Sequence, residues 1–117
     1  MSADREHSIS THVLDTERGE PAAGVPVTLS RWGRDGLVAL ATHETDRDGR
    51  IRDLAGGSLP GGAYQLAFDV AAYLRGQGRD APFVTRVAID FRVSDTGRHL
   101  HVPLLLSPYS CTAYRGS

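Results

Sequence analysis

A few side chains in this sequence combine residue types and spacings that suit acid–base chemistry on a small ligand. His12 lies in an alternating segment near the start, Arg50 follows an Asp-Gly turn, and His99 and His101 form a His-x-His pair near the end. An imidazole can take a proton from water near pH 7, and a guanidinium offers a forked set of donors to an oxyanion or a planar polar ligand. Against this, a single histidine on a strand is more often a hydrogen-bonded surface residue than a catalyst.

The same histidines raise the question of a metal site. Imidazole is a good zinc ligand, and the i, i+2 spacing of His99 and His101 presents two ligands on one side of a strand. No carboxylate or cysteine completes a set at a familiar spacing, and Cys111 is the single cysteine of the chain. We therefore predict no metal and no cofactor, and zinc-dependent hydrolysis remains an alternative that metal analysis would separate.

The sequence lacks the residues that several other kinds of catalytic or binding site require. All 13 basic residues are arginine, so a lysine Schiff base and a Walker-type phosphate loop are excluded. The G-x-S-x-G motif of serine hydrolases is missing. Asp46, Asp48 and Gly49 resemble the start of a calcium loop, but the later ligands of that loop do not follow. This segment is predicted to be a turn.

Apolar residues at every second position predict the strands that must hold these side chains. A hairpin is expected across residues 33–36, and a short helix is expected after Asp69, which can cap it, with Gly76 and Gly78 to stop it. The predicted strands cover residues 9–14, 25–30, 37–42, 50–54, 64–68, 84–93 and 98–106. The fold class is therefore all-β: a two-sheet antiparallel sandwich of about eight strands with one short helix.

Composition and charge indicate a single domain and exclude some classes of binding partner. The 117 residues, 40% of them hydrophobic, suit a single domain over 1–117, with residues 1–7 expected to be flexible. The formal charge of −1 and the lack of like-charge runs argue against nucleic acid or a membrane surface as partners. No apolar stretch reaches the roughly 20 residues of a membrane span, and no secretory signal is visible. A cytoplasmic protein is expected.

Apolar residues on the outer faces of two predicted strands indicate that several copies of the chain assemble. His12 and Leu14 lie opposite the core-facing side of their strand, and His101, Pro103 and Leu105 do the same on theirs. An outer sheet face that is partly apolar is usually covered, and a second copy of the chain is the simplest cover.

Three motifs in order give the chain a resemblance to a known family. Residues 10–15 read STHVLD, residues 99–109 read HLHVPLLLSPY, and residues 114–117 close the chain with YRGS. With DGR at residues 48–50 between them, they resemble the transthyretin-like proteins over about residues 8–117. The closing tetrapeptide is similar to the hallmark of the 5-hydroxyisourate hydrolase branch of this family.

The resemblance implies an eight-stranded sandwich in a homotetramer whose central channel holds the active sites. It also implies hydrolytic ring opening of the small molecule 5-hydroxyisourate in urate degradation, without a cofactor. Carried over by position, the catalytic residues are His12, Arg50 and His101, and the substrate-binding residues are His12, Arg50, Tyr114 and Ser117. Which histidine is the general base stays open, and a non-catalytic carrier of a small aromatic ligand is the alternative function.

The sequence also predicts where the C-terminus goes. Residues 100–109 are expected to form a strand that leads into a turn at Ser107 and Pro108. Residues 109–114 can then return antiparallel beside it, which would bring Tyr114 back toward His101. We therefore expect the C-terminus to belong to the site rather than to be a loose tail.

Overall fold

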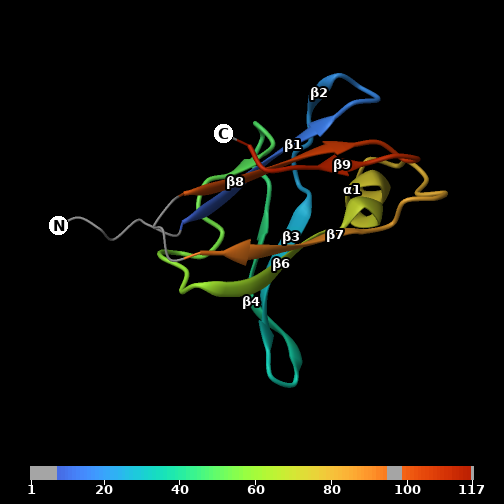
Figure 1. Ribbon diagram of the computed structural model, residues 1–117. Coiled ribbons are helices and arrows are strands. Elements are labelled where there is room, and N and C mark those ends of the chain that lie inside the picture. Colours follow the sequence, from blue (N-terminus) through green and yellow to red (C-terminus); the bar gives the residue numbers. More distant parts are fainter. Residues whose placement is uncertain (1–7, 95–98, 117) are drawn as a thin grey trace.

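Two β-sheets pack face to face, with a short helix at one end, in the part of the chain that the structure describes (Figure 1). The computed structural model describes residues 8–94 and 99–116. The first sheet contains β1 (Ile9–Asp15), β2 (Glu20–Pro21), β5 (Arg50–Ile51), β8 (Leu100–Leu106) and β9 (Thr112–Ala113). The second sheet has the order β4-β3-β6-β7, with β3 (Pro26–Gly33), β4 (Gly36–Glu44), β6 (Gly62–Phe68) and β7 (Val87–Val93). The helix α1 (Val70–Gly76) follows β6.

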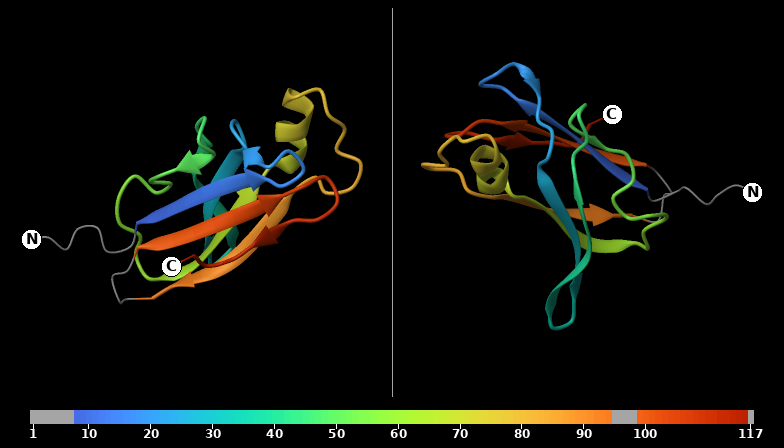
Figure 2. Two further views of the ribbon diagram at one scale, coloured as in Figure 1. Left: turned by 90° about the horizontal axis from the view of Figure 1, so that it is seen from above. Right: turned by 180° about the vertical axis from the view of Figure 1, so that it is seen from behind.

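One strand pair departs from the antiparallel prediction. β1 and β8 run parallel from Ile9 opposite Leu100 to Asp15 opposite Leu106, side by side at the middle of the first sheet (Figure 2). Parallel neighbours need a long connection, and here the chain supplies it by building the second sheet between them. The two-sheet sandwich and the short helix are confirmed. The prediction that every pairing is antiparallel is wrong for this pair.

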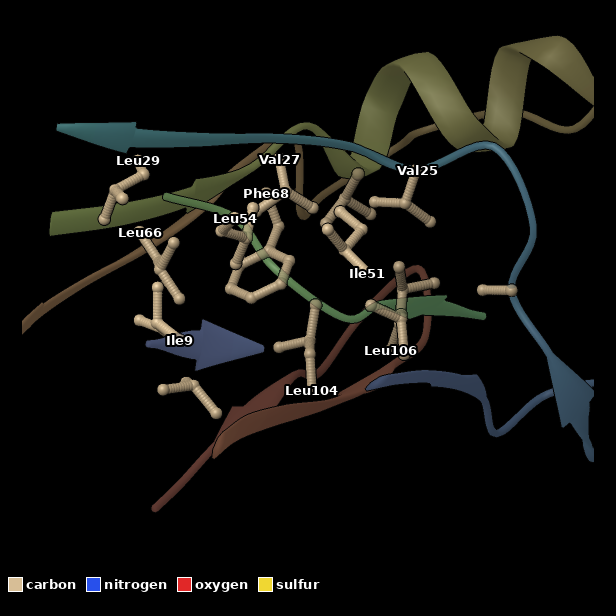
Figure 3. Close-up of a cluster of buried hydrophobic side chains, with 14 of the residues drawn as sticks. Ile9, Val25, Val27, Leu29, Ile51, Leu54, Leu66, Phe68, Leu104 and Leu106 are labelled. Carbon is tan, nitrogen blue, oxygen red and sulfur yellow. The ribbon is translucent and has the colours of Figure 1, made fainter. Parts of the chain in front are cut away.

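The core lies between the two sheets and is formed by alternating side chains of both (Figure 3). Fully buried residues of the first sheet include Ile9, Val13 and Leu104, and they face Leu66 and Phe68 of the second sheet. The intervening residues of β1, which include His12, are half-buried on the outer side. The predicted alternation of this strand is therefore confirmed, and it turns His12 away from the core.

Two predicted strands are shorter than expected because their backbone groups bond elsewhere. The Val84 N–H donates to the Pro108 carbonyl, and the Thr85 carbonyl accepts the Ala71 N–H of the helix, so β7 begins only at residue 87. The side chain of Asp53 accepts the N–H groups of residues 56 and 57, which closes a turn soon after β5. The predicted helix cap is confirmed, since an Asp69 carboxylate oxygen accepts the Ala72 N–H at 3.0 Å.

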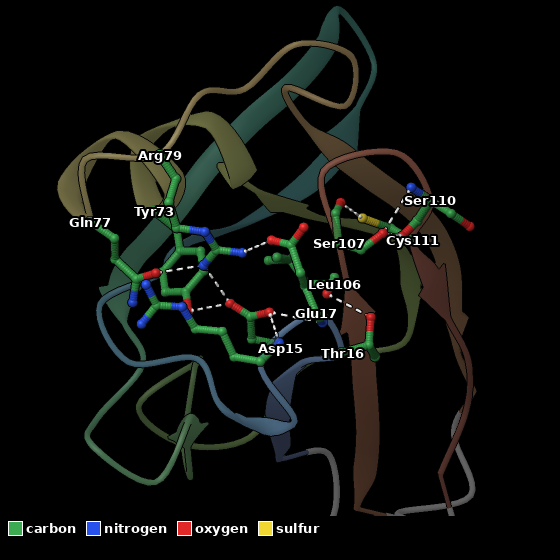
Figure 4. A network of polar contacts seen from close by, with 11 residues as sticks. Asp15, Thr16, Glu17, Tyr73, Gln77, Arg79, Leu106, Ser107, Ser110 and Cys111 are labelled. Carbon is green, nitrogen blue, oxygen red and sulfur yellow. Dashed lines mark hydrogen bonds and ion pairs between the residues drawn. The ribbon is translucent and has the colours of Figure 1, made fainter.

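A buried carboxylate ties the end of β1 to the segment after the helix (Figure 4). Asp15 is fully buried, and its Oδ2 accepts hydrogen bonds from the Tyr73 hydroxyl at 2.8 Å and from Arg79 Nη1 at 2.7 Å. Its Oδ1 accepts the backbone N–H groups of Glu17 and Arg18. Burial raises the pKa of Asp15, but the bonds from Arg79 and Tyr73 outweigh it and the pKa lies below its ordinary value.

Replacing Arg79 with methionine is expected to lower the free energy of unfolding at pH 7 by about 2–3 kcal/mol, because Asp15 keeps its other donors but loses its cation. A carboxylate whose pKa is lowered by folding stabilises above its unfolded pKa of about 4 and loses this contribution as the pH falls through the folded value. Urea unfolding at pH 7 and pH 3 measures both effects, with the exposed Arg34→Met as control. Equal stabilities of Arg79→Met and wild type at pH 7 would contradict the assignment.

No helix among the described residues is long and apolar enough to cross a membrane. The expected flexibility of residues 1–7 lies outside the described residues.

Candidate active site

Strand pairing on the first sheet brings the predicted site residues onto one outer face. Arg50 of β5 lies opposite His12 of β1, and His12 lies opposite Pro103 of β8 on its other side. Two residues before His12 on β1, Ser10 lies opposite His101 of β8. The antiparallel pairing of β5 with β1 and the parallel pairing of β1 with β8 therefore place Arg50, His12 and His101 on neighbouring strands, although they are far apart in the sequence.

An open hollow of about 350 Å³ lies over one end of this face. Its volume is in the range of small-molecule pockets, which are typically about 300–1,000 Å³. It is lined by Ser10, Thr11, Arg50, Ile51, Arg52, His99 and His101. His12 and Tyr114 do not line it within this single chain, although His12 lies beside Arg50.

The turn before β5 positions Arg50. Asp46 accepts the backbone N–H of Arg50 at 2.9 Å and that of Asp48 at 2.8 Å, and these bonds lower the pKa of the Asp46 carboxyl. Gly49 has a φ of +76°, and a Cβ there would lie 2.4 Å from the Val13 carbonyl oxygen. Only glycine therefore fits where this turn touches β1, next to His12. The segment is the predicted turn, and it places Arg50 opposite His12 of β1.

His101 is half-buried between β1 and the C-terminal segment. Burial lowers the pKa of its imidazole, and the charges of His12, His99 and Arg50 lower it further. The charged form is thus disfavoured at this position. The lowered pKa favours the neutral imidazole, which is the form that can accept a proton.

The C-terminal segment returns along β8, as the sequence predicts. β9 pairs antiparallel with β8, and beyond it the Tyr114 N–H donates to the Pro103 carbonyl. The Gly116 N–H then donates to the His101 carbonyl at 2.7 Å. A Cβ at Gly116 would lie 2.8 Å from His101 Cδ2, so the chain passes directly against the imidazole ring. Ser117 lies outside the described residues.

This return corrects one expectation about the outer face. The strand pattern predicts that Pro103 is open to a second copy of the chain, but the structure buries it within the chain. The residue-116 backbone covers it, since a Cβ there would lie 3.3 Å from Pro103 Cγ. Leu105 remains exposed on the same face, together with Tyr109 and Tyr114 nearby.

Four residues that line the hollow were not predicted as site residues, namely Ser10, Thr11, Ile51 and Arg52. Ser10 has the parity of His12 on β1, and Arg52 has the parity of Arg50, so the period-2 pattern was the signal that could have found them. Serine and arginine are common surface residues, and nothing in their local sequence separates these two from the others. Arg52 adds a second guanidinium to the hollow.

No group of three or more His, Cys, Asp or Glu residues is arranged to hold a metal ion within residues 8–94 and 99–116. His99 and His101 instead meet at the Ser10 hydroxyl.

The chain is a two-sheet β-sandwich whose sheet face carries a candidate small-molecule site, an open hollow lined by imidazole and guanidinium groups. The family comparison agrees with this architecture. The chain belongs to the HIUase/Transthyretin family, whose model matches residues 9–116.

Relatives from both branches of the family are similar to this chain. A 5-hydroxyisourate hydrolase of Caulobacter vibrioides is 46% identical over 93% of this chain and 97% of its own length. The solved structure of Klebsiella pneumoniae 5-hydroxyisourate hydrolase has a TM-score of 0.84 at 40% identity, covering 95% of this chain and 99% of that one. Sea bream transthyretin, solved in complex with thyroxine, has a TM-score of 0.83 at 32% identity, covering 93% and 94% of the two chains.

Proposed function

We propose that this protein is a 5-hydroxyisourate hydrolase, which opens the ring of its substrate with water to give 2-oxo-4-hydroxy-4-carboxy-5-ureidoimidazoline. The observation that carries this proposal is that the His101 imidazole and the Arg50 guanidinium line one hollow. The relatives named as 5-hydroxyisourate hydrolases support it. The reaction belongs to urate degradation, within purine metabolism, and we place it in the cytoplasm.

The chemistry needs a base for water and a partner for the oxyanion. His101 takes a proton from water as the water oxygen bonds to a ring carbonyl carbon, and Arg50 donates to the oxyanion that forms. The oxyanion then collapses to a carbonyl as the ring C–N bond breaks, and the leaving nitrogen takes up the proton that His101 removed from water. Arg52 adds positive charge on the same side of the hollow. His12, beside Arg50, orients the water or the substrate.

The substrate contacts include two further residues of the C-terminal motif. We assign Tyr114 and Ser117, together with His12 and Arg50, to substrate binding. The bond from the Tyr114 N–H to Pro103 supports this assignment, because it fixes the start of the motif at the level of His12.

An activity assay separates this function from the carrier alternative. Added to freshly generated 5-hydroxyisourate, the protein should accelerate the loss of the ultraviolet band well beyond spontaneous decay. Chelator treatment should leave this rate unchanged, whereas a zinc-dependent enzyme would lose it. A carrier of the kind represented by transthyretin would bind an aromatic ligand and leave the decay rate of 5-hydroxyisourate unaltered.

We further propose a homotetramer, and the apolar surface beside the site supports it. Leu105, Tyr109 and Tyr114 are 37%, 67% and 47% exposed in the single chain, and they lie around β8 and β9. Covering such a surface with further copies of the chain removes apolar area from water. Size exclusion with light scattering should give four chains per particle. A fully active monomer at micromolar concentration would contradict the assembly.

A further inference from the structure

A continuous set of hydrogen bonds joins His101 to three residues that the mechanism above does not use. Ser10 Oγ lies 2.8 Å from His101 Nδ1 and 2.9 Å from His99 Nε2. His99 Nδ1 in turn lies 2.6 Å from Ser8 Oγ. The parallel register of β1 and β8 creates this arrangement, because it sets Ser10 directly opposite His101.

The single proton of the Ser10 hydroxyl restricts how these bonds are made. Ser10 can donate to one imidazole only, so it must accept from the other. In the first arrangement, His101 donates from Nδ1 to Ser10, Ser10 donates to His99 Nε2, and His99 Nδ1 donates to Ser8. In the second, every one of these bonds is reversed. Both histidines are neutral in both arrangements, and only the tautomers differ.

Within residues 8–94 and 99–116, the Nε2 of His101 makes no hydrogen bond. The hydrogen bonds made among the described residues engage only the Nδ1 of this ring. In the first arrangement Nε2 carries no proton, so it can accept one from water. His101 also lines the hollow, whereas His12 does not. His101, rather than His12, is therefore the histidine that the geometry favours as base.

We propose that Ser10 and His99 form a proton relay that lets His101 accept the water proton at Nε2 while its Nδ1 proton passes toward Ser8. The Nδ1 proton moves to Ser10, the Ser10 proton moves to His99 Nε2, and the His99 Nδ1 proton moves to Ser8, which releases its own proton to solvent. When Nε2 protonates the leaving nitrogen, the same protons return in the opposite direction. The net proton count is zero.

The relay avoids forming a positively charged imidazolium at His101. A base that takes a proton without losing another becomes an imidazolium, and burial with Arg50 and His12 nearby disfavours that ion. With the relay, His101 passes from one neutral tautomer to the other. This role rests on the proposed hydrolysis, and Ser10 and His99 act in it through His101, as positioning residues.

Kinetics of four variants test the relay. Ser10→Ala should lower kcat by about 10- to 100-fold with little change in KM, within the range of acid–base contributions. Ser10→Thr, which keeps the hydroxyl, should restore most of the loss. His99→Phe should resemble Ser10→Ala, whereas His43→Phe, at an exposed histidine of the second sheet, should behave as wild type. A raised KM at unchanged kcat would make Ser10 a substrate contact and overturn the relay.

Solvent isotope effects distinguish proton transfer through Ser10 from a purely structural role of Ser10, because a structural role would leave them unchanged. In mixtures of H₂O and D₂O, the wild-type kcat should fall along a curved line, because several protons move in one step. The Ser10→Ala line should be straight. A straight line for the wild type would overturn the relay.

A measurement without substrate keeps this proposal separable from the proposed function. In ¹⁵N NMR of labelled histidine, His101 should carry its proton on Nδ1 in the wild type and on Nε2 in Ser10→Ala. A proton on Nε2 in both proteins overturns the relay alone. Failure of the wild type to hydrolyse 5-hydroxyisourate overturns the proposed function, and a relay for that reaction with it, whatever the tautomer.

Discussion

Replacement of His101 by asparagine should lower kcat by about 10²–10⁴, the usual range for a general acid–base group. The ring lies on the outer face of the first sheet, half-buried, so its loss should leave the circular dichroism spectrum unchanged. His12→Asn should also reduce kcat, with the smaller effect if it orients water and His101 removes the proton. Steady-state kinetics on freshly generated substrate measures both variants.

A charge reversal at Arg50 tests the guanidinium of the proposed site. Arg50→Glu replaces the proposed donor for the oxyanion by an acceptor and should repel an electron-rich substrate, so the loss of activity should be at least as large as in His101→Asn. Arg47→Glu makes the same charge change at an exposed position of the same turn and should keep activity. If His101→Asn, His12→Asn and Arg50→Glu all retained the wild-type rate, the active site would lie elsewhere.

The alternation of single strands was predictable because it depends on local chemistry. Val13 and His12 belong to opposite faces in the sequence pattern and do so in the structure. The cap at Asp69 and the turn before Arg50 follow from residues a few positions apart. These features need only the backbone geometry of a short segment, which the sequence specifies directly.

The partners of each strand were less predictable because they depend on the whole chain. Nothing near Ser10 in the sequence indicates that it bonds to His101, since the contact exists only through the parallel pairing of β1 with β8. The burial of Pro103 likewise depends on the return of residue 116, more than ten positions away. The histidines and Arg50 could be picked out as candidates because their side chains suit acid–base chemistry. Ser10 and Arg52 could be assigned to the hollow only from the folded structure.

Deleting residues 115–117 should sharply reduce kcat/KM while the circular dichroism spectrum and the assembly stay intact. Chain ends are usually expendable, so this result would be unusual. Here the Gly116 N–H donates to the His101 carbonyl, and the backbone at Gly116 lies against the imidazole ring. Removing the segment would free the ring that we propose as the base. A purification tag fused to the C-terminus should impair activity for a related, steric reason.

A single methyl group tests the same contact more finely. In Gly116→Ala, the new Cβ would lie 2.8 Å from His101 Cδ2 and 3.4 Å from the His101 carbonyl oxygen, so either the ring or the segment must move. Gly76→Ala is the matched control, because a Cβ at that helical glycine meets nothing within 4 Å. We expect activity to fall in the first variant and to persist in the second. Undiminished turnover in both Gly116→Ala and the truncated protein would show that the C-terminal segment is dispensable and would leave His12, Arg50 and His101 to carry the chemistry alone.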